Sequence, residues 1–221
     1  MSNLNGLDIN SNIELDDYIS AHIDAEEPLL KSLYRETFLK TVNPRMASGH
    51  IQGTFLKTIV RMIHPENILE LGTFTAYATL SMAAGLERNG HIHTIEINDE
   101  LEPLINRYIG RSEHKERITL HIGNAKDIVP QIGIMFDMIF IDAEKREYPD
   151  YYNLVFDYLK PGGYIIADNT LWDMHIIDPA YSNDAQTAAI RKFNDIVALD
   201  SRVEVSIVPI RDGMTIIRKK A

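Results

Sequence analysis

The chain has 221 residues, 45% of them hydrophobic, which suits one α/β domain with a substantial core and a few added helices. Its formal net charge of -10 offers no general basic surface for nucleic acid or anionic lipid, and the lack of cysteine excludes disulfides and thiolate metal sites. The start of the chain does not resemble a signal peptide, and no apolar run approaches the length that spans a bilayer. We therefore expect a cytoplasmic protein without a membrane partner.

The N-terminal part is predicted to be helical. We expect a loose arm up to about Asn12, and the spacing of apolar residues then predicts helices at residues 13–22, 27–41 and 51–63. Pro44 ends the second helix because proline lacks the backbone donor that a helix needs. We expect residues 1–65 to form a helical cap on an α/β core of residues 66–221, both within a single domain of residues 1–221.

Strands and helices alternate after residue 66. Strands are expected at residues 68–71, 91–97, 118–122, 136–141 and 164–167, and helices at 76–88, 99–110, 125–131 and near 149–159. A polar, aromatic loop at 171–184 and a helix at 185–199 precede two strands, 203–207 and 214–218, which an Arg-Asp-Gly turn joins. This order predicts a doubly wound, Rossmann-like α/β fold. Its seven-stranded sheet is mostly parallel, with an antiparallel C-terminal hairpin.

Two of these strands end in polar residues with metal-binding chemistry. The run FDMIFI leads into Asp142 and Lys145, and the run YIIA leads into Asp168 and Asn169. Because ligands bind at the carboxyl ends of parallel strands, two carboxylates and an amide oxygen there form a hard oxygen set suited to Mg²⁺ or Ca²⁺. Taken singly, the aspartates are also typical of helix caps and Lys145 of a solvated charged run. Their joint occurrence on two strands favours metal-assisted chemistry on an oxygen nucleophile.

The loop after the first core strand, ILELGTFTAY, precedes a helix and is placed to receive a nucleotide. It lacks the three-glycine spacing of dinucleotide sites, since only Gly72 is present. Glu70 would repel a pyrophosphate but attract an ammonium or sulfonium group, and Glu96 is placed to accept hydrogen bonds from a ribose diol. S-adenosylmethionine satisfies both acids, whereas NAD satisfies only the second. For either acid alone, an ordinary polar strand end is an equally good interpretation.

These motifs identify a family resemblance. From about Met46 to Arg218 the chain resembles the cation-dependent class I O-methyltransferases of the catechol and caffeoyl-CoA type, with the bacterial branch as the nearest form. The segments that carry the resemblance are QG at 52–53, ELGTFTAY at 70–77, TIEIN at 94–98, GNA at 123–125, FIDAEK at 140–145, DNTLW at 168–172 and RDG at 211–213. FIDAEK followed by DNTLW is the most specific pair.

The resemblance implies roles for individual residues. The implied metal ligands are Asp142, Asp168 and Asn169, for magnesium or else calcium or manganese, and the implied catalytic residues are Lys145 as general base and Asp142. The implied contacts of S-adenosylmethionine are Glu70, Gly72, Thr73, Tyr77, Glu96, Ile97, Gly123, Asn124, Ala125 and Asp142. The implied substrate contacts are Met46, Ser48, Lys145 and Trp172. The chain departs from the family where Ala76 replaces a usual glycine, Ala78 a usual serine, and Ser206 a glutamate of the animal catechol enzymes.

These observations predict an S-adenosylmethionine-dependent, metal-dependent O-methyltransferase for a small catechol-like or hydroxylated aromatic molecule. Lys145 must be neutral to accept a proton, and we expect partial burial and a nearby cation to lower its pKa. A hydroxyuridine in tRNA is the alternative acceptor, which the acidic charge disfavours. A catalytically silent protein that binds S-adenosylmethionine is the third hypothesis. We expect a homodimer, as relatives commonly form.

Overall fold

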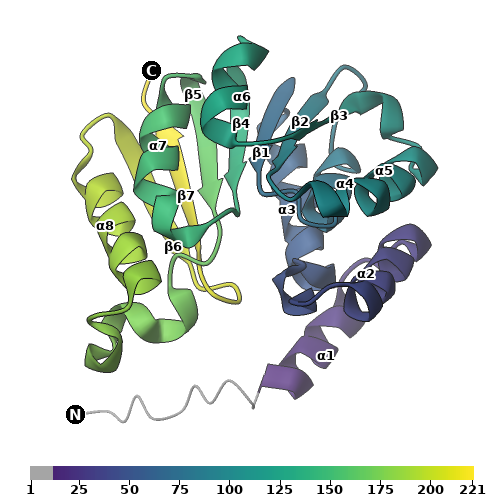
Figure 1. The fold of residues 1–221 in the computed structure, drawn as a ribbon, viewed down its shortest axis with the longest axis horizontal. Helices are drawn as coiled ribbons and strands as arrows, with labels where there is room; N and C mark the ends of the chain where they lie inside the picture. Colours follow the sequence, from purple (N-terminus) through teal and green to yellow (C-terminus); the bar gives the residue numbers. More distant parts are fainter. Residues whose placement is uncertain (1–11) are drawn as a thin grey trace.

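The computed structural model describes residues 12–221, so the predicted N-terminal arm lies almost wholly outside the described residues. A seven-stranded sheet in the order β3-β2-β1-β4-β5-β7-β6 runs through the molecule (Figure 1). The strands are β1 Asn67–Leu71, β2 His91–Glu96, β3 Ile118–Ile122, β4 Phe136–Ile141, β5 Leu159–Ala167, β6 Val203–Val208 and β7 Met214–Lys219. Strands β1 to β5 pair in parallel, and β7 pairs antiparallel with both β5 and β6. The predicted fold is therefore confirmed.

Helices cover both faces of the sheet, as doubly wound folds require (Figure 1). They are α1 Asn12–His22, α2 Pro28–Lys40, α3 Gly49–Ile63, α4 Tyr77–Ala83, α5 Glu102–Arg111, α6 Ala125–Ile132, α7 Tyr148–Phe156 and α8 Ala185–Leu199. Residues of α6, α7 and α8 pack with one face of the strands, and residues of α2, α3, α4 and α5 pack with the other face. The central strands are buried on both faces, which explains their continuous apolar sequences.

The N-terminal helices share their core with the α/β part. Leu33 of α2 and Leu56 of α3 belong to the same buried cluster as Ile68 and Ile92 of the sheet. The division into a helical cap and an α/β core stays a prediction. Within residues 12–221, no helix combines the length and the apolar character that crossing a bilayer requires.

The strand order reverses between β1 and β4, and this reversal positions the site. The chain returns to the middle of the sheet there, so that the carboxyl ends of β1, β4 and β5 lie side by side. In doubly wound sheets, ligands bind in the crevice at such a reversal.

Several boundaries differ from the sequence prediction for identifiable reasons. Helix α4 ends at Ala83 rather than near residue 88, because the chain turns closely under α3: a Cβ at Gly85 would lie 2.6 Å from the carbonyl oxygen of Lys57. Strand β5 begins at Leu159, five residues early, since the Lys-Pro-Gly-Gly segment is an irregularity within the strand rather than a turn before it. The predicted loop at 171–184 contains two short 3₁₀ segments, Trp172–Ile177 and Pro179–Tyr181.

Candidate active site

Two aspartates follow neighbouring strands at the carboxyl edge of the sheet. The backbone N–H of Asp142 donates to the carbonyl of Leu71 at the end of β1, at 2.9 Å. The N–H of Asp168 donates to the carbonyl of Ile141 at the end of β4, at 3.0 Å. These bonds continue the parallel ladder by one residue beyond each strand, and they fix both aspartates at the strand ends where the sequence placed them.

Lys145 reaches back to this edge from a 3₁₀ turn, Lys145–Glu147, directly before α7. Its Nζ donates to Asp142 Oδ1 at 2.7 Å and to the hydroxyl of Tyr148 at 3.1 Å. The Tyr148 hydroxyl in turn donates to the carbonyl of Asp168 at 2.9 Å. Because residues three apart lie above one another in a 3₁₀ turn, Lys145 and Tyr148 point to the same side. The lysine therefore lies between the two strand ends.

The pKa of Lys145 is raised in the structure, whereas the sequence prediction, which assumed a nearby cation, was a lowered pKa. Burial by itself lowers the pKa of Lys145, but the carboxylates of Asp142 and Asp168 and the phenol of Tyr148 outweigh that effect and raise its pKa above the ordinary value. Lys145 is thus an ammonium group here, and burial alone does not prepare it as a base.

Asp168 is almost fully buried and tightly oriented. Its Oδ2 accepts a hydrogen bond from Gln52 Nε2 at 2.6 Å, and its Oδ1 accepts one from the backbone N–H of Asn169 at 2.8 Å. Burial and the nearby charge of Asp142 raise the pKa of Asp168 to about 6. Asn169 has a left-handed backbone (φ 57°), and its Nδ2 donates to Asp212 Oδ2 at 3.2 Å.

The donors at this edge fit a divalent cation chemically. Asp142, Asp168 and Asn169 offer two carboxylates and an amide oxygen, the ligand type that Mg²⁺ and Ca²⁺ prefer. The pKa of Asp168 is raised chiefly by its burial and further by the charge of Asp142, and a bound cation would favour the charged form of both carboxylates. Within residues 12–221, no group of three or more His, Cys, Asp or Glu side chains is suited to a metal, and only two members of the predicted set, Asp142 and Asp168, are of these residue types. The metal ligands therefore stay a prediction.

Glu70 is completely buried at the end of β1. Its Oε2 accepts hydrogen bonds from the hydroxyls of Thr79 and Thr94, the latter at 2.5 Å, while its Oε1 is buried without a hydrogen-bond partner. Burial, together with the charges of Asp142 and Glu96, raises the pKa of Glu70 to about 8. An unpartnered carboxylate oxygen in a protein interior is costly, and a cationic ligand group nearby would relieve that cost.

Glu96, at the end of β2, contacts the loop that follows β1. Its two oxygens accept the backbone N–H groups of Phe74 at 2.6 Å and Asn98 at 2.9 Å. Burial raises its pKa in spite of these bonds. Each oxygen keeps a second lone pair for a ligand, as a ribose-binding acid requires.

Gly72 allows this loop to approach the neighbouring strand end. Its φ is 94°, and a Cβ there would lie 2.1 Å from the carbonyl oxygen of Asp142. Ala76 also has a left-handed backbone (φ 72°), which glycine adopts freely but alanine adopts at a cost of about 1 kcal/mol. This conformation explains why a glycine would suit the position.

The other predicted cofactor residues lie around the same loops, but several of their polar groups have partners within the protein. The Thr73 hydroxyl bonds that of Thr94 at 2.5 Å, the Tyr77 hydroxyl donates to Glu26 at 2.6 Å, and the Asn124 side chain caps α6 by accepting from the Lys126 N–H. The remaining predicted cofactor residues have no polar side-chain group. Ile97 is exposed, Ala125 is buried, and Gly123 has a positive φ of 142°.

The predicted substrate contacts come from two distant segments. Met46 is exposed and Ser48 is buried at the start of α3, whereas Trp172 begins the segment after β5. Trp172, Asp173 and Met174 all have left-handed backbones, an unusual run for residues other than glycine. Arg191 supports this segment from α8 through the carbonyls of His175, Ile176 and Asp178.

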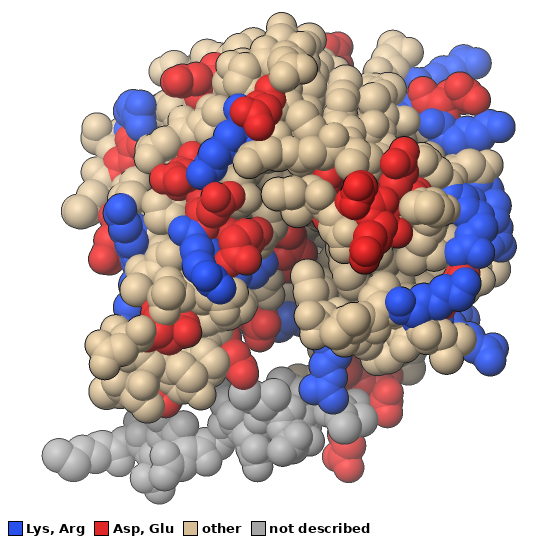
Figure 2. All heavy atoms as spheres, viewed as in Figure 1, with Lys and Arg blue, Asp and Glu red and all other residues tan. Residues whose placement is uncertain are grey.

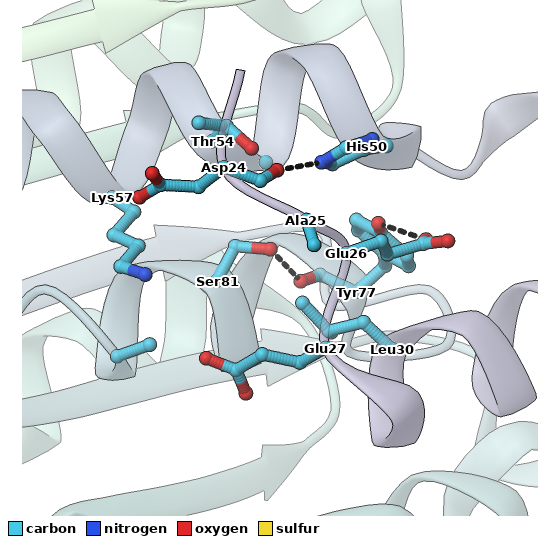
Figure 3. Close-up of a pocket in the computed structure, with 12 residues that line it drawn as sticks. Asp24, Ala25, Glu26, Glu27, Leu30, His50, Thr54, Lys57, Tyr77 and Ser81 are labelled. Atoms are coloured by element: carbon cyan, nitrogen blue, oxygen red, sulfur yellow. Dashed lines mark hydrogen bonds between the residues drawn. The ribbon is translucent and has the colours of Figure 1, made fainter. Parts of the chain in front are cut away.

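A separate pocket lies between the segment that joins α1 to α2 and the helices α3 and α4 (Figure 3). Its lining includes Glu26 and Tyr77, whose side chains lie together in this view. It contains none of the residues at the ends of β4 and β5, and Tyr77 is the predicted cofactor contact that it includes.

Four residues at the site had no role in the sequence prediction. Gln52, Arg211 and Asp212 were noted only as parts of the QG and RDG motifs, and Tyr148 was not singled out. The position of Tyr148, three residues after Lys145, was a usable signal of proximity. Nothing local in the sequence shows that Gln52 meets Asp168, 116 positions away.

Comparisons with known proteins agree with this geometry. A family model described as O-methyltransferase matches residues 18–220. The catechol O-methyltransferase of Niastella koreensis is 31% identical over 198 residues, which cover 88% of this chain and 89% of the relative. The caffeoyl-CoA O-methyltransferase of Zinnia elegans is 31% identical over 191 residues, 79% of this chain and 76% of the relative. The crystal structure of the O-methyltransferase from Bacillus cereus in complex with SAH superposes with a TM-score of 0.90 at 28% identity, covering 96% of this chain and 100% of the other. The chain therefore belongs to this family of O-methyltransferases.

Proposed function

We propose that the protein transfers a methyl group from S-adenosylmethionine to a hydroxyl of a small catechol-like or hydroxylated aromatic molecule, with a divalent cation bound at Asp142, Asp168 and Asn169. The observation that carries this proposal is the cluster at the ends of β4 and β5, where Lys145 lies 2.7 Å from Asp142 and is linked through Tyr148 to Asp168. The names of the relatives support the acceptor class, and the SAH complex of the Bacillus cereus protein supports the methyl donor.

The methyl donor would lie along the ends of β1 and β2. The unpartnered Oε1 of Glu70 supports this placement, since a cationic methionyl part nearby would favour the charged form of a carboxyl group that burial otherwise keeps protonated below about pH 8. Glu96 has free lone pairs for the ribose hydroxyls. Gly72 allows the loop after β1 to pack closely against the end of β4, because a Cβ there would overlap the backbone of Asp142. Ala78 has no hydroxyl for the methionyl carboxylate, so that contact must come from another group.

A bound divalent cation would supply charge that lowers the pKa of a coordinated phenol, whose ordinary value is about 10. Asp142 and Asp168 would hold the cation, and they are the same carboxylates that now keep Lys145 protonated. A cation held there would also offset the carboxylate charge that favours the protonated form of Lys145. Neutral Lys145 would then be placed to accept the proton of the acceptor hydroxyl. Tyr148 keeps the lysine in place throughout, because its hydroxyl contacts both Lys145 and the Asp168 carbonyl.

The acceptor would enter between Met46 and Ser48 on one side and Trp172 on the other. The exposed Met46 and the half-buried Trp172 provide apolar surface for an aromatic ring. Ser206 stands where the animal catechol enzymes place a glutamate, so we expect a broader acceptor range than catechol alone.

The alternative acceptor, a hydroxyuridine in tRNA, finds no support in the names of these relatives. Basic side chains gather at the right-hand edge in Figure 2, where Figure 1 places α5. Part of this charge has partners, since Arg107 pairs with Glu36 at 2.7 Å and Arg117 donates to the carbonyls of Leu86 and Glu87. Loss of a methoxyuridine from the tRNA of a deletion strain, measured by mass spectrometry, would overturn the small-molecule acceptor.

The test is a methyl-transfer assay across a panel of diphenols, with Mg²⁺ and with EDTA. We expect turnover that EDTA abolishes and Mg²⁺ restores. Lys145→Ala should retain affinity for the methyl donor but lose roughly 10²–10⁴-fold in rate. Lys160→Ala is the matched control, because Lys160 makes an ion pair of the same length with Asp137 at the opposite end of β4 and β5. Binding of S-adenosylmethionine without any turnover would instead support the silent-protein hypothesis. Sedimentation would test the expected homodimer.

A further inference from the structure

The turn between β6 and β7 touches both sides of the predicted active site. On one side, the carbonyls of Asp212 and Gly213 accept the N–H groups of Leu171 and Thr170, and Asp212 also accepts from the Asn169 side chain. On the other side, Arg211 extends toward the segment before and within the first turns of α3. The turn therefore joins two segments that are more than 100 positions apart in the chain.

Arg211 is held in a defined geometry. Its backbone is left-handed (φ 48°), and its Nη1 donates to the carbonyl of Ser48, to the carbonyl of Ala47 at 3.3 Å and to Gln52 Oε1 at 2.8 Å. Its Nη2 approaches the carbonyl of Arg45 at 3.4 Å. A guanidinium group has five donors in a fixed plane, so one arginine can satisfy several carbonyls and an amide oxygen at once.

These contacts determine which way the Gln52 amide points. Arg211 has only donors, so the Gln52 atom that faces it must be the oxygen. The Gln52 nitrogen then faces Asp168 Oδ2, to which it donates at 2.6 Å. Gln52 is almost completely buried, so a reversed amide would leave both a donor and an acceptor without partners.

The chain of contacts ends on a predicted metal ligand. Asp168 accepts one hydrogen bond on each carboxylate oxygen, from Gln52 and from the Asn169 N–H, and these bonds fix the plane of the carboxylate. Residues that orient a metal ligand in this manner commonly change metal affinity 10–100-fold when they are replaced.

We propose that Arg211 is a positioning residue for the cation site, acting through Gln52 on the orientation of Asp168. This inference rests on the proposed function, because it assumes that Asp168 binds the cation. It assigns the β6–β7 turn a role in the reaction without placing Arg211 in contact with any reactant. The same arginine also fixes the segment of Met46 and Ser48, so that the acceptor side and the cation side of the crevice are set by one residue.

The test measures Mn²⁺ affinity by electron paramagnetic resonance, in the presence of SAH, without any turnover. Arg211→Ala should weaken Mn²⁺ binding about 10-fold, since Gln52 loses the partner that orients it. The affinity for SAH should stay unchanged. Arg211→Lys should restore part of the Mn²⁺ affinity, because lysine supplies a donor but not the planar fork. Arg218→Ala is the matched control, since Arg218 lies on the same hairpin and pairs with the exposed side chain of Glu204 at 3.0 Å.

Two variants of Gln52 separate orientation from general stability. Gln52→Glu keeps an acceptor for Arg211 but loses the donor to Asp168, so it should weaken Mn²⁺ binding at least as much as Arg211→Ala. Gln52→Leu removes both contacts, and adding Arg211→Ala to it should cause no further loss if the two residues act as one chain. The Gln52 variants leave Arg211 in place, and they decide the question if Arg211→Ala does not fold.

The outcomes distinguish this inference from the proposed function. If the wild-type protein binds no Mn²⁺, the cation-dependent function fails, and this inference fails with it. If the wild-type protein binds Mn²⁺ and the Arg211 and Gln52 variants bind it equally well, only this inference is overturned. Additive losses in the double variant would also overturn it, because they would show that Arg211 and Gln52 act independently.

Discussion

Two regions of the molecule carry titratable side chains that are partly or fully buried: the carboxyl edge of β4 and β5, and strands β2 and β3. The two regions are built differently. At the edge, Asp142, Lys145 and Asp168 come from loops and turns that follow the strands. On β2 and β3, three histidines project from the strands themselves: His91, His93 and His121. The rings of His93 and His121 stack at 5.3 Å, with a nitrogen–nitrogen contact of 3.0 Å.

The difference lies in how each region satisfies its polar groups. Burial lowers the pKa of all three histidines, so the imidazoles are neutral and bond to one another and to Thr119. The edge instead holds opposed charges, and Glu70 beside it keeps an oxygen without a partner. In the part of the chain that the structure describes, Glu70 Oε1 and Asn194 Oδ1 are the buried side-chain atoms without hydrogen bonds. The histidines find hydrogen-bond partners within their own group and in Thr119, whereas the edge region keeps an unpartnered oxygen on Glu70. This contrast supports our proposal that the edge is the functional region.

The largest expected effect is a loss of activity, and it tests the contrast between the carboxyl edge and the histidine group directly. Asp168→Ala should lower Mg²⁺-dependent methyl transfer at least about 100-fold, because it removes a proposed cation ligand and even residues that only orient such ligands matter by about 10–100-fold. His121→Ala should change the rate by less than about threefold, since the hydrogen bond of His121 is to His93, within the histidine group. Initial rates at saturating donor and Mg²⁺ measure both. Equal losses in the two variants would show that the functional region has been misidentified.

The second prediction concerns the pH dependence of stability near the edge. The pKa of Glu70 is about 8 in the folded protein, above its ordinary value of 4.5, so the folded state binds this proton more tightly. The stability that this proton provides is complete below about pH 4.5 and is lost as the pH rises toward 8. Glu70→Gln removes the titration while its carbonyl still accepts from Thr79 and Thr94.

We therefore expect Glu70→Gln to be more stable than the wild type at pH 8 by roughly 2–4 kcal/mol, with little difference at pH 4.5. Urea unfolding at several pH values measures this difference. The same variant should bind the methyl donor less tightly, because its amide cannot take on the negative charge that a methionyl cation would favour at position 70. A gain in stability together with unchanged donor affinity would show that Glu70 is only a buried strand residue.

Much of the fold was predictable because its signals are local. Continuous apolar runs identified the buried strands, and the Arg-Asp-Gly turn identified the antiparallel hairpin. The aspartates of the edge were also predictable, since each directly follows such a run. The Lys-Pro-Gly-Gly segment misled the prediction of β5, because its residues resemble a turn but form an irregularity within the strand.

The hydrogen bonds that orient the site residues were not predictable, because they join segments that are distant in the sequence. Gln52 meets Asp168 only after α3 packs beside the sheet, and Arg211 meets Gln52 only after the hairpin folds back. The pKa of Lys145 was expected to be lowered, but the opposing effect comes from the number of carboxylates around it, which sequence spacing does not give.

The smallest expected effect lies in the histidine group and has the opposite pH dependence to that of Glu70. Burial, with smaller effects from His91 and His121, lowers the pKa of His93 to about 4, below its ordinary value of 6.5. The unfolded chain therefore binds the proton first, and stability is lost as the pH falls from about 6.5 toward 4. Because His93 is only half-buried, we expect the loss in the free energy of unfolding to be of order 1 kcal/mol.

In urea unfolding at several pH values, His93→Gln should reduce the loss of stability between about pH 6.5 and pH 4. His22→Gln, at an exposed histidine, should leave that acid limb of the stability curve unchanged. An acid limb that persists in His93→Gln would mean that other groups control it, and the neutral character assigned to the β2–β3 face would then lose its support.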